Sequence, residues 1–423
     1  MSALNLAVIL PAAYRGGTLR GALNIARMLK IGADACGDAL RLSFGHIDDP
    51  SLYHDADFEA LRALGVRIRP FRHEIIPASA LSSLYEGWVE ADPTRGASEY
   101  MLFNDGVSNF EDADFWLIIS DRLNIALPPH RRYAIVVYDY IQRYVPAIFG
   151  QTPDRTAPWL QFESYAEAAR RAEFVICTTE QTRRDCVAYV GVEPDRARLF
   201  PMEFDPLAEQ APSRRASRAP YVLWTTNSTH HKNHLNVLDG LERFFRSHPD
   251  LPHEVRISGV LTHLFEESAK DEPHFDDPYL VEVRDKIAEC EAVRARLRIL
   301  GNLPDSQYVA QLAHADLLLH GALYDNGTFS VLEAAWFGVP AVSSAYPAMR
   351  EIESRFGVPL EYFQAADPES LAAALARAFA DPAAARARLP DRERLRRHSF
   401  EATAPQYWTA FRQALSACMQ AGA

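Results

Sequence analysis

Short apolar runs alternate with segments of helical periodicity along most of the chain, and this alternation predicts an α/β fold. Residues 4–10 form an apolar run that ends at Pro11, which is typical of a buried strand, and apolar residues then recur at helical spacing to Lys30. The same reading predicts further strands at 40–46, 66–71, 115–120, 133–138, 174–177, 199–204, 221–224, 255–259, 297–300, 317–319 and 341–342.

The length and one change of composition predict two domains. A chain of 423 residues exceeds the size of one typical core. Residues 206–219 are rich in Pro, Ala, Ser and Arg without apolar periodicity, so we interpret them as a linker. We therefore expect Rossmann-like domains at 1–205 and 220–398, facing a cleft of the kind that often binds ligands, and a C-terminal helix at 399–423. Residues 77–114 show no clear period and are expected to be loops.

Charge and cysteine content exclude several classes of function. The net charge of −12 argues against general nucleic-acid binding and against attraction of the whole surface to anionic lipid, although a local basic patch stays open. Arg67, Arg69 and Arg72 are interpreted as one solvated face. The five cysteines are scattered without a CxxC pair, which is typical of reduced thiols. With no signal peptide and no apolar run near the ~20 residues of a membrane span, we expect a cytoplasmic protein with at most a peripheral contact at the inner membrane face.

Residues 316–346 carry the strongest candidate site. An apolar run at 317–319 leads into a polar loop at 324–328, then a helical pattern at 329–337 that Gly338 ends as a C′ residue would. The loop therefore lies at the carboxyl end of a strand, where open α/β sheets bind their ligands.

The residues of this loop suit an anionic, hydroxylated ligand. Thr328 is a candidate N-cap, and Gly327 would let a phosphate approach the free backbone N–H groups that follow. Asp325 and Glu333 lie eight residues apart, and carboxylates accept strong hydrogen bonds from sugar and ribose hydroxyls. The alternative is an ordinary strand–helix–strand unit in which Glu333 is exposed to solvent.

The sequence Asp-Asn-Gly-Thr-Phe-Ser-Val-Leu-Glu at 325–333, followed by Ala334 and by Gly-Val-Pro at 338–340, resembles a family signature. It is similar to the nucleotide-sugar motif of glycosyltransferase family 4, retaining enzymes of the GT-B fold, whose usual form is Glu-Gly-Phe-Gly-x-x-x-x-Glu. The resemblance implies that Asp325 contacts the donor sugar and Glu333 the ribose. The donor would also contact Gly327, Thr328, Phe329 and Ser330. The first acid is Asp where the family usually has Glu.

A second loop, TTNSTHHKNH at 225–234, follows the first strand of the second half. Lys232 would stand at a helix start, as phosphate-binding lysines do. His230, His231 and His234 suggest zinc as an alternative, but they lack a Cys or carboxylate partner at useful spacing. By resemblance, this loop is the His-Lys-Asn-His variant of the family's diphosphate loop. Asn227 then lies where more usual members carry Gly-Arg.

Two candidates lie in the first half of the chain. Gly16 and Gly17 follow the first strand and would let the backbone approach a phosphate or sugar. The family carries a Gly-Gly loop at this place, facing the donor. Asp139 ends the run at 133–138, as in the family strand that ends in His-Asp near the reacting sugar, with Tyr138 here in place of the His. The alternative for Asp139 is a capping role in the following turn.

Taken as a resemblance, these motifs imply a retaining hexosyltransferase that uses a nucleoside diphosphate sugar and needs no metal or other cofactor. The variants are most similar to bacterial mannosyltransferases of surface polysaccharide assembly, which implies GDP-mannose as donor and a glycan or lipid-linked glycan as acceptor. UDP-sugars and deoxysugar donors stay open. Two other functions also stay open: an epimerase or phosphorylase of the same fold, and a noncatalytic scaffold that binds nucleotide sugars.

Overall fold

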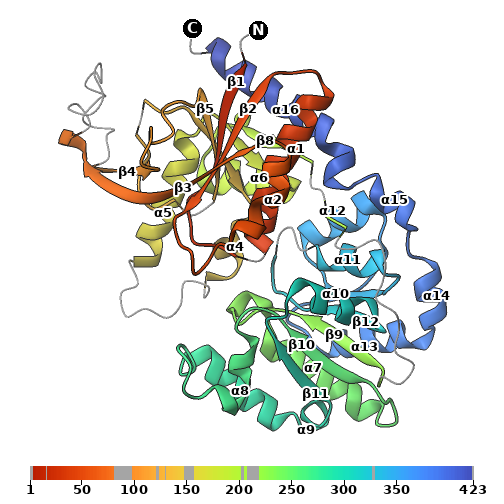
Figure 1. The fold of residues 1–423 in the computed structure, drawn as a ribbon. Coiled ribbons are helices and arrows are strands. Elements are labelled where there is room, and N and C mark those ends of the chain that lie inside the picture. Colours follow the sequence, from red (N-terminus) through yellow and green to blue (C-terminus); the bar gives the residue numbers. More distant parts are fainter. Residues whose placement is uncertain are drawn as a thin grey trace. The chain divides into compact units, whose positions relative to one another are not determined.

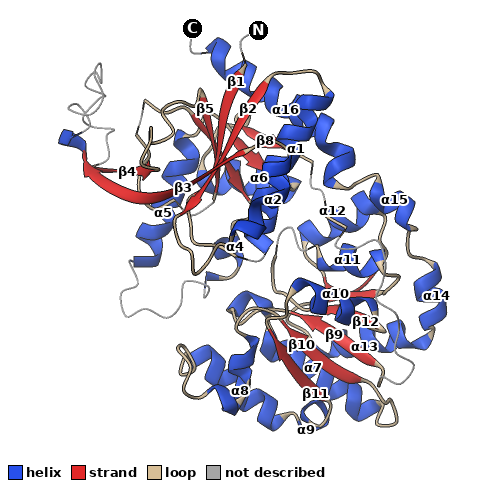
Figure 2. Cartoon of the chain, viewed as in Figure 1, coloured by secondary structure: helices blue, strands red, loops and turns tan. Residues whose placement is uncertain are grey.

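The computed structural model describes residues 3–15, 17–80, 98–120, 123–128, 130–146, 157–201, 204–206, 219–325 and 329–421. The chain forms two compact units, both of the α/β class. Unit 1 comprises Met1–Tyr140, Gln151–Glu203 and Phe400–Ala423, and unit 2 comprises Ile141–Gly150 and Phe204–Ser399. Each unit has strands in its interior with helices beside them (Figure 2).

Unit 1 is built on an eight-stranded sheet of order β4-β3-β2-β1-β5-β6-β7-β8, drawn in Figure 1. Every neighbouring pair is parallel except β3 and β4. The strands are β1 (Leu4–Leu10), β2 (Leu40–Ile47), β3 (Arg67–Pro77), β4 (Glu99–Asn104), β5 (Phe115–Ile119), β6 (Tyr133–Val137), β7 (Val175–Cys177) and β8 (Ala197–Leu199). The main helices are α1 (Gly17–Ala35), α2 (Glu59–Ala63), α5 (Ala157–Arg171), α6 (Glu180–Asp185) and α16 (Phe400–Ala421).

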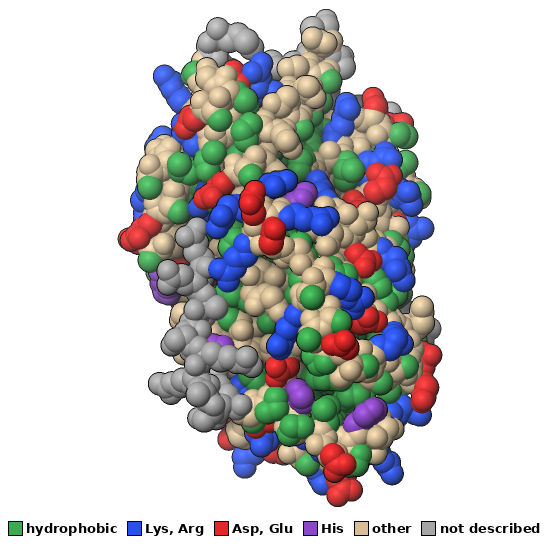
Figure 3. Space-filling view, turned by 90° about the vertical axis from the view of Figure 1, so that its right-hand side faces the viewer, with side chains coloured by type: hydrophobic (Ala, Val, Ile, Leu, Met, Phe, Trp, Pro, Cys, Tyr) green, Lys and Arg blue, Asp and Glu red, His purple; other side chains and the backbone are tan. Residues whose placement is uncertain are grey.

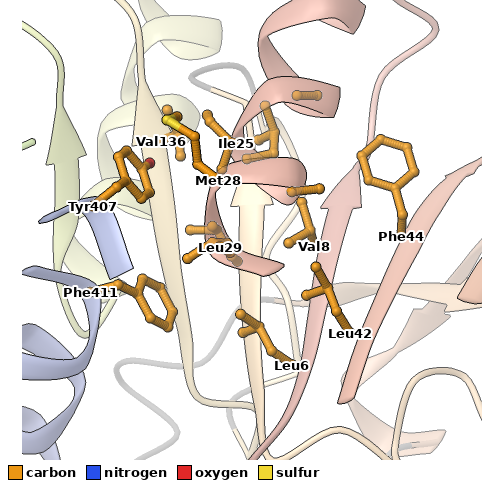
Figure 4. Close-up of a cluster of buried hydrophobic side chains, with 14 of the residues drawn as sticks. Leu6, Val8, Ile25, Met28, Leu29, Leu42, Phe44, Val136, Tyr407 and Phe411 are labelled. Atoms are coloured by element: carbon orange, nitrogen blue, oxygen red, sulfur yellow. The ribbon is translucent and has the colours of Figure 1, made fainter. Parts of the chain in front are cut away.

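The last helix completes the core of unit 1. Residues of α16 join strands β1, β2 and β6 and helix α1 in one buried apolar cluster. Figure 4 shows Tyr407 and Phe411 of α16 beside Met28 and Leu29 of α1. Trp408 adds a hydrogen bond of 2.7 Å from its indole Nε1 to Asp38. The end of the chain therefore stabilises the first unit by burying apolar surface.

Unit 2 has a six-stranded parallel sheet of order β11-β10-β9-β12-β13-β14. Its strands are β9 (Tyr221–Thr225), β10 (Glu254–Ser258), β11 (Leu297–Gly301), β12 (Leu317–His320), β13 (Ala341–Ser344) and β14 (Leu360–Phe363). Its helices are α4 (Ile141–Tyr144), α7 (His234–Ser247), α8 (Pro278–Glu289), α9 (Glu291–Arg294), α10 (Asp305–Ala313), α11 (Ser330–Trp336), α12 (Pro347–Phe356), α13 (Pro368–Ala380), α14 (Pro382–Ala387) and α15 (Arg392–Arg396). The strand order reverses between β9 and β12, so the loops after these two strands flank the point where such sheets bind ligands.

The structure corrects two expectations about strands. The region 77–114 contains β4, which pairs antiparallel with the extended β3, so its pattern was wrongly interpreted as loops alone. Ile76, Tyr100 and Leu102 form a small apolar cluster on one face of this pair, while Met101 and Phe103 join Phe71 in a larger cluster. The strand predicted at 199–204 lies instead at Ala197–Leu199. Most of the predicted linker, 207–218, lies outside the described residues.

The predicted solvated face of three arginines is wrong for Arg69 only, because the side chains of Arg67 and Arg72 are 57% and 81% exposed. Arg69 is buried, donates hydrogen bonds of 2.7 and 2.8 Å to Asp105 and Asp112, and lies over the Phe110 ring. Arg67 lies 3.8 Å from Asp112, and Arg72 lies 3.1 Å from Asp48. Because each guanidinium already faces a carboxylate, the three do not form a uniform basic patch. On the face drawn in Figure 3, Lys and Arg are likewise interspersed with Asp and Glu.

All five cysteines are free thiols, three of them buried. Among the described residues, no helix has both the length and the apolar character that crossing a membrane requires.

Candidate active site

Two loops meet at the switch point of the unit 2 sheet. The loop after β9 carries a short 3-10 helix, His230–Lys232, and the loop after β12 carries Asp325. The ammonium of Lys232 forms an ion pair with Oδ2 of Asp325, and only 15% and 11% of these side chains are exposed. The structure therefore brings together two residues that the sequence analysis assigned to a diphosphate and to a sugar.

Asp325 is ionised in this setting. Burial acts to raise the pKa of its carboxyl group, but Lys232, with His231 and His320, outweighs burial and holds that pKa well below its usual range. His320 lies at the end of β12 with its Nε2 2.9 Å from the Tyr346 hydroxyl. Burial lowers the pKa of His320 to about 4, so a neutral imidazole lies near the carboxylate at neutral pH.

The backbone around Lys232 is fixed by several hydrogen bonds. The Oδ1 atom of Asn227 accepts from the Thr229 N–H at 3.0 Å, and the Leu323 N–H donates to the His231 carbonyl at 2.7 Å. Asn233 has a left-handed backbone (φ 65°), and its Nδ2 donates to the carbonyls of Gly321 and Ala365 at 3.0 and 2.6 Å. The loop after β9 is thus bonded to the loops after β12 and β14 before any ligand is considered.

The loop after β10 lies against the loop after β9. A Cβ atom added to Gly259, directly after β10, would lie 1.6 Å from the Thr226 carbonyl oxygen, so only glycine fits there. The next two side chains, Val260 and Leu261, remain 51% and 39% exposed. The carboxyl edge of β10 therefore presents apolar surface beside the Lys232 loop.

Of the three histidines that suggested zinc, His234 is fully buried. Both ring nitrogens of His234 are already used, with Nε2 3.0 Å from Thr226 Oγ1 and Nδ1 2.8 Å from the Tyr279 hydroxyl. Burial lowers the pKa of His234 to about 3. Within the described part of the chain, no three His, Cys, Asp or Glu side chains are grouped as metal ligands.

Helix α11 begins one residue later than predicted. Its N-cap is Phe329, without a side-chain cap, whereas the predicted cap Thr328 and the predicted glycine Gly327 lie outside the described residues. Ser330 opens the helix, and its buried Oγ has no hydrogen-bond partner in the described structure. Gly338 follows the helix with φ 73°, as predicted for a C′ residue.

Glu333 lies in the first turn of α11 and is only 5% exposed, so the alternative of a solvent-exposed Glu333 is wrong. The hydroxyl of Tyr308, from α10, donates a 2.8 Å hydrogen bond to Oε2 of Glu333. Sequence analysis missed Tyr308, because one tyrosine in a helical pattern carries no signal of such a contact. The tyrosine fixes the orientation of a buried carboxylate at the same edge of the sheet as Asp325.

The remaining predicted residues belong to unit 1. Asp139 follows β6 and is 9% exposed. Gly17 is the first residue of α1, where an added Cβ would meet no heavy atom within 4 Å. Gly16 lies outside the described residues. The preceding loop is held by the Tyr53 hydroxyl, which donates to the Tyr14 carbonyl at 2.7 Å.

Comparison with known proteins gives the fold a name. Residues 208–398 match the family model described as Glycosyl transferases group 1. No match was found among curated protein sequences.

Solved structures are similar over nearly the whole chain. Sucrose-phosphate synthase from Thermosynechococcus elongatus has a TM-score of 0.63 at 15% identity, over 98% of this chain and 100% of that one. Anabaena HepE in complex with UDP has a TM-score of 0.59 at 14% identity, over 98% and 100%. The α,α-trehalose 6-phosphate synthase from Burkholderia multivorans has a TM-score of 0.58 at 12% identity, over 99% and 100%. The chain therefore has the GT-B fold of glycosyltransferases, and its residues 208–398 match glycosyl transferases group 1.

Proposed function

We propose that the protein is a retaining hexosyltransferase, similar to family 4, that transfers a hexose from a nucleoside diphosphate sugar to a glycan or lipid-linked glycan. The observation that carries this proposal is the buried Lys232–Asp325 pair at the switch point of a unit that matches glycosyl transferases group 1. A cation and a carboxylate side by side suit the two parts of such a donor, the diphosphate and the sugar hydroxyls.

The candidate site residues of unit 2 have separate roles in this proposal. Lys232 stabilises the negative charge that develops on the leaving diphosphate. Asp325 accepts hydrogen bonds from the sugar, and Glu333, oriented by Tyr308, accepts them from the ribose. Within the described residues the buried Oγ of Ser330 has no hydrogen-bond partner, and an O–H group there suits a phosphate oxygen.

By resemblance to family 4, we also propose that Asp139, Gly16 and Gly17 contribute to recognition of the donor. The acceptor hydroxyl attacks on the face from which the diphosphate leaves, with a leaving phosphate oxygen as base. Lys232 supplies the countercharge in this scheme, so we propose that transfer needs no metal ion.

The donor we propose is GDP-mannose, in bacterial surface polysaccharide assembly. Support comes from the His-Lys-Asn-His and Gly-Thr-Phe-Ser variants, which resemble those of bacterial mannosyltransferases. A UDP-sugar is the alternative, because HepE was solved with UDP and with UDP-glucose. The exposed side chains of Val260 and Leu261 offer apolar surface for either nucleobase.

Thermal unfolding of the purified protein with GDP, UDP, dTDP or ADP, without added metal, tests the proposal. One nucleotide should stabilise the fold by about 2.7 kcal/mol at a hundred times its Kd. Relative to its own unfolding temperature without nucleotide, Glu333→Ala should lose this shift, whereas Glu369→Ala, at an exposed position on α13, should keep it. No shift with any of the four nucleotides would refute nucleotide-sugar binding.

Catalysis is tested next with the donor that the selected nucleotide indicates. We expect slow hydrolysis of the donor without acceptor, and NMR should show that the released sugar first appears with its anomeric configuration retained. Binding without hydrolysis or transfer would instead identify a noncatalytic scaffold, and inverted product would refute the retaining mechanism.

A further inference from the structure

A segment between β10 and β11 packs onto the Lys232 loop. It contains Thr262–Phe265 and helix α8 (Figure 1). Leu264, Phe265, Tyr279, Leu280 and Val283 join the apolar core of unit 2. These five side chains lie in the interior, so they tie the position of the segment to the core it packs on.

Arg284 makes this segment rigid. Its side chain is 8% exposed, and its two terminal nitrogens donate to the carbonyls of Leu264 and Phe275 at 2.9 and 2.8 Å. The guanidinium also lies 3.6 Å from the centre of the Phe275 ring. One side chain of α8 thus fixes the loop that precedes the helix, through two hydrogen bonds and a cation–π contact.

Tyr279, in the first turn of α8, makes the contact with the Lys232 loop. It is 5% exposed, and the Asp277 carboxylate caps its backbone N–H at 2.9 Å. Its ring stacks on His230 with the ring centres 3.8 Å apart. Its hydroxyl lies 3.3 Å from the backbone N–H of His234 and 2.8 Å from Nδ1 of the same residue.

These contacts bracket Lys232. His230 lies two residues before the lysine, and His234 lies two residues after it at the start of α7. The N–H of His234 is among the first N–H groups of that helix, which have no partner within it, so the tyrosine hydroxyl satisfies a donor that would otherwise be unpaired. A single side chain therefore holds both flanks of the lysine.

We propose that Tyr279 is a positioning residue for Lys232. It holds the His230–His234 segment and with it the ammonium of Lys232. That this ammonium meets the donor diphosphate rests on the proposed function. The ring and the hydroxyl have separable tasks, because the ring supports the flank before the lysine and the hydroxyl supports the flank after it.

The test compares Tyr279→Phe, which keeps the ring, and Tyr279→Leu, which removes both contacts, with Tyr221→Phe. Tyr221 is a matched control, because it is a buried tyrosine of the same unit whose hydroxyl donates a 2.5 Å hydrogen bond to the Gln311 carbonyl, away from the loop. Two measurements are made on each protein: amide hydrogen exchange of a peptide covering 226–236 without ligand, and the Kd for the nucleoside diphosphate that binds the wild type best.

We expect faster exchange in the 226–236 peptide and a Kd weaker by about tenfold for Tyr279→Phe, with a larger loss for Tyr279→Leu, since a small displacement of a binding group has effects of this size. Tyr221→Phe should match the wild type in both. Unchanged exchange in both Tyr279 variants would overturn the proposal, and so would faster exchange with unchanged Kd. If the wild type binds no nucleotide, the proposed function fails, and the exchange measurement alone decides whether Tyr279 positions the loop.

Discussion

Replacing Lys232 with methionine should destabilise unit 2 far more than the loss of a surface ion pair would. Lys232→Met keeps much of the side-chain volume but removes the ammonium that pairs with the buried Asp325 carboxylate. The two side chains are 15% and 11% exposed, so water can solvate the remaining charge only weakly. Asp325→Asn makes the complementary change by removing the anion and leaving the ammonium.

The magnitude follows from this burial. Removing one partner of a buried pair typically costs about 3–5 kcal/mol, because the other charge is left without compensation. The double variant removes both charges, so its cost should fall short of the sum of the single costs by about 2–3 kcal/mol. A surface pair would give an interaction of about 0.2–1 kcal/mol.

Urea unfolding at pH 7 of the wild type, the two single variants and the double variant gives this interaction energy. Arg243 and Glu369 provide the matched control, because they form an exposed pair of the same unit at 3.1 Å, with side chains 59% and 77% exposed. Their cycle, with Arg243→Met and Glu369→Gln, should give less than about 1 kcal/mol. Equal interaction energies in the two cycles would refute the reasoning.

The pH dependence provides a second test of the same pair. In the wild type the folded pKa of Asp325 lies below its unfolded value near 3.9, so the pair's contribution is complete at neutral pH and is lost only in strong acid. In Lys232→Met the strongest opposing charge is gone, so burial should raise the folded pKa above 3.9. The folded variant then takes up a proton as the pH falls, and its deficit relative to wild type should shrink between pH 7 and pH 4. A deficit that is constant over this range would contradict the assignment of burial as the opposing effect.

Two further predictions concern the same edge of the sheet. Asn233→Gly should be more stable than Asn233→Ala by about 1 kcal/mol in urea unfolding, because alanine is strained at φ 65° while both variants lose the side-chain hydrogen bonds. In an ordinary helical position the order is reversed. An Ala variant at least as stable as the Gly variant would therefore count against the left-handed backbone at Asn233. Burial lowers the pKa values of His234 and His320 to about 3 and about 4, so between pH 6.5 and pH 4 the unfolded chain binds more protons and stability falls with the pH. Each histidine should contribute about 2 kcal/mol of loss from pH 7 to pH 5. His320→Gln should therefore flatten the curve of unfolding free energy against pH, and an unchanged slope would contradict the burial of that imidazole.

Much of the fold follows from short-range pattern. The apolar runs at 221–224 and 317–319 and the glycine at 338 carry strong local signals, and the structure has strands and a helix end at those places. Tertiary contacts decided the rest. Among the described residues, strand β4 lies at the edge of its sheet in a region of polar and aromatic residues. Helix α8 has a charged sequence around its buried face, so neither element shows a clean period. Periodicity indicates how much of a segment is buried, but it says little where the burial depends on a single aromatic side chain.

The candidate site, too, could be predicted from the sequence only in part. Parallel strands with a reversal of order bring the loops after β9 and β12 to one edge, so the neighbourhood of Lys232 and Asp325 could be expected from the motifs and the topology together. The direct ion pair could not, because the sequence analysis assigned the two residues to different parts of a ligand. The pair also gives a physical meaning to Asp325 at a position where the signature that this loop resembles usually carries Glu. Lys232 reaches this shorter carboxylate and keeps it ionised within a buried edge, so a carboxylate and a cation lie side by side at the switch point of the sheet.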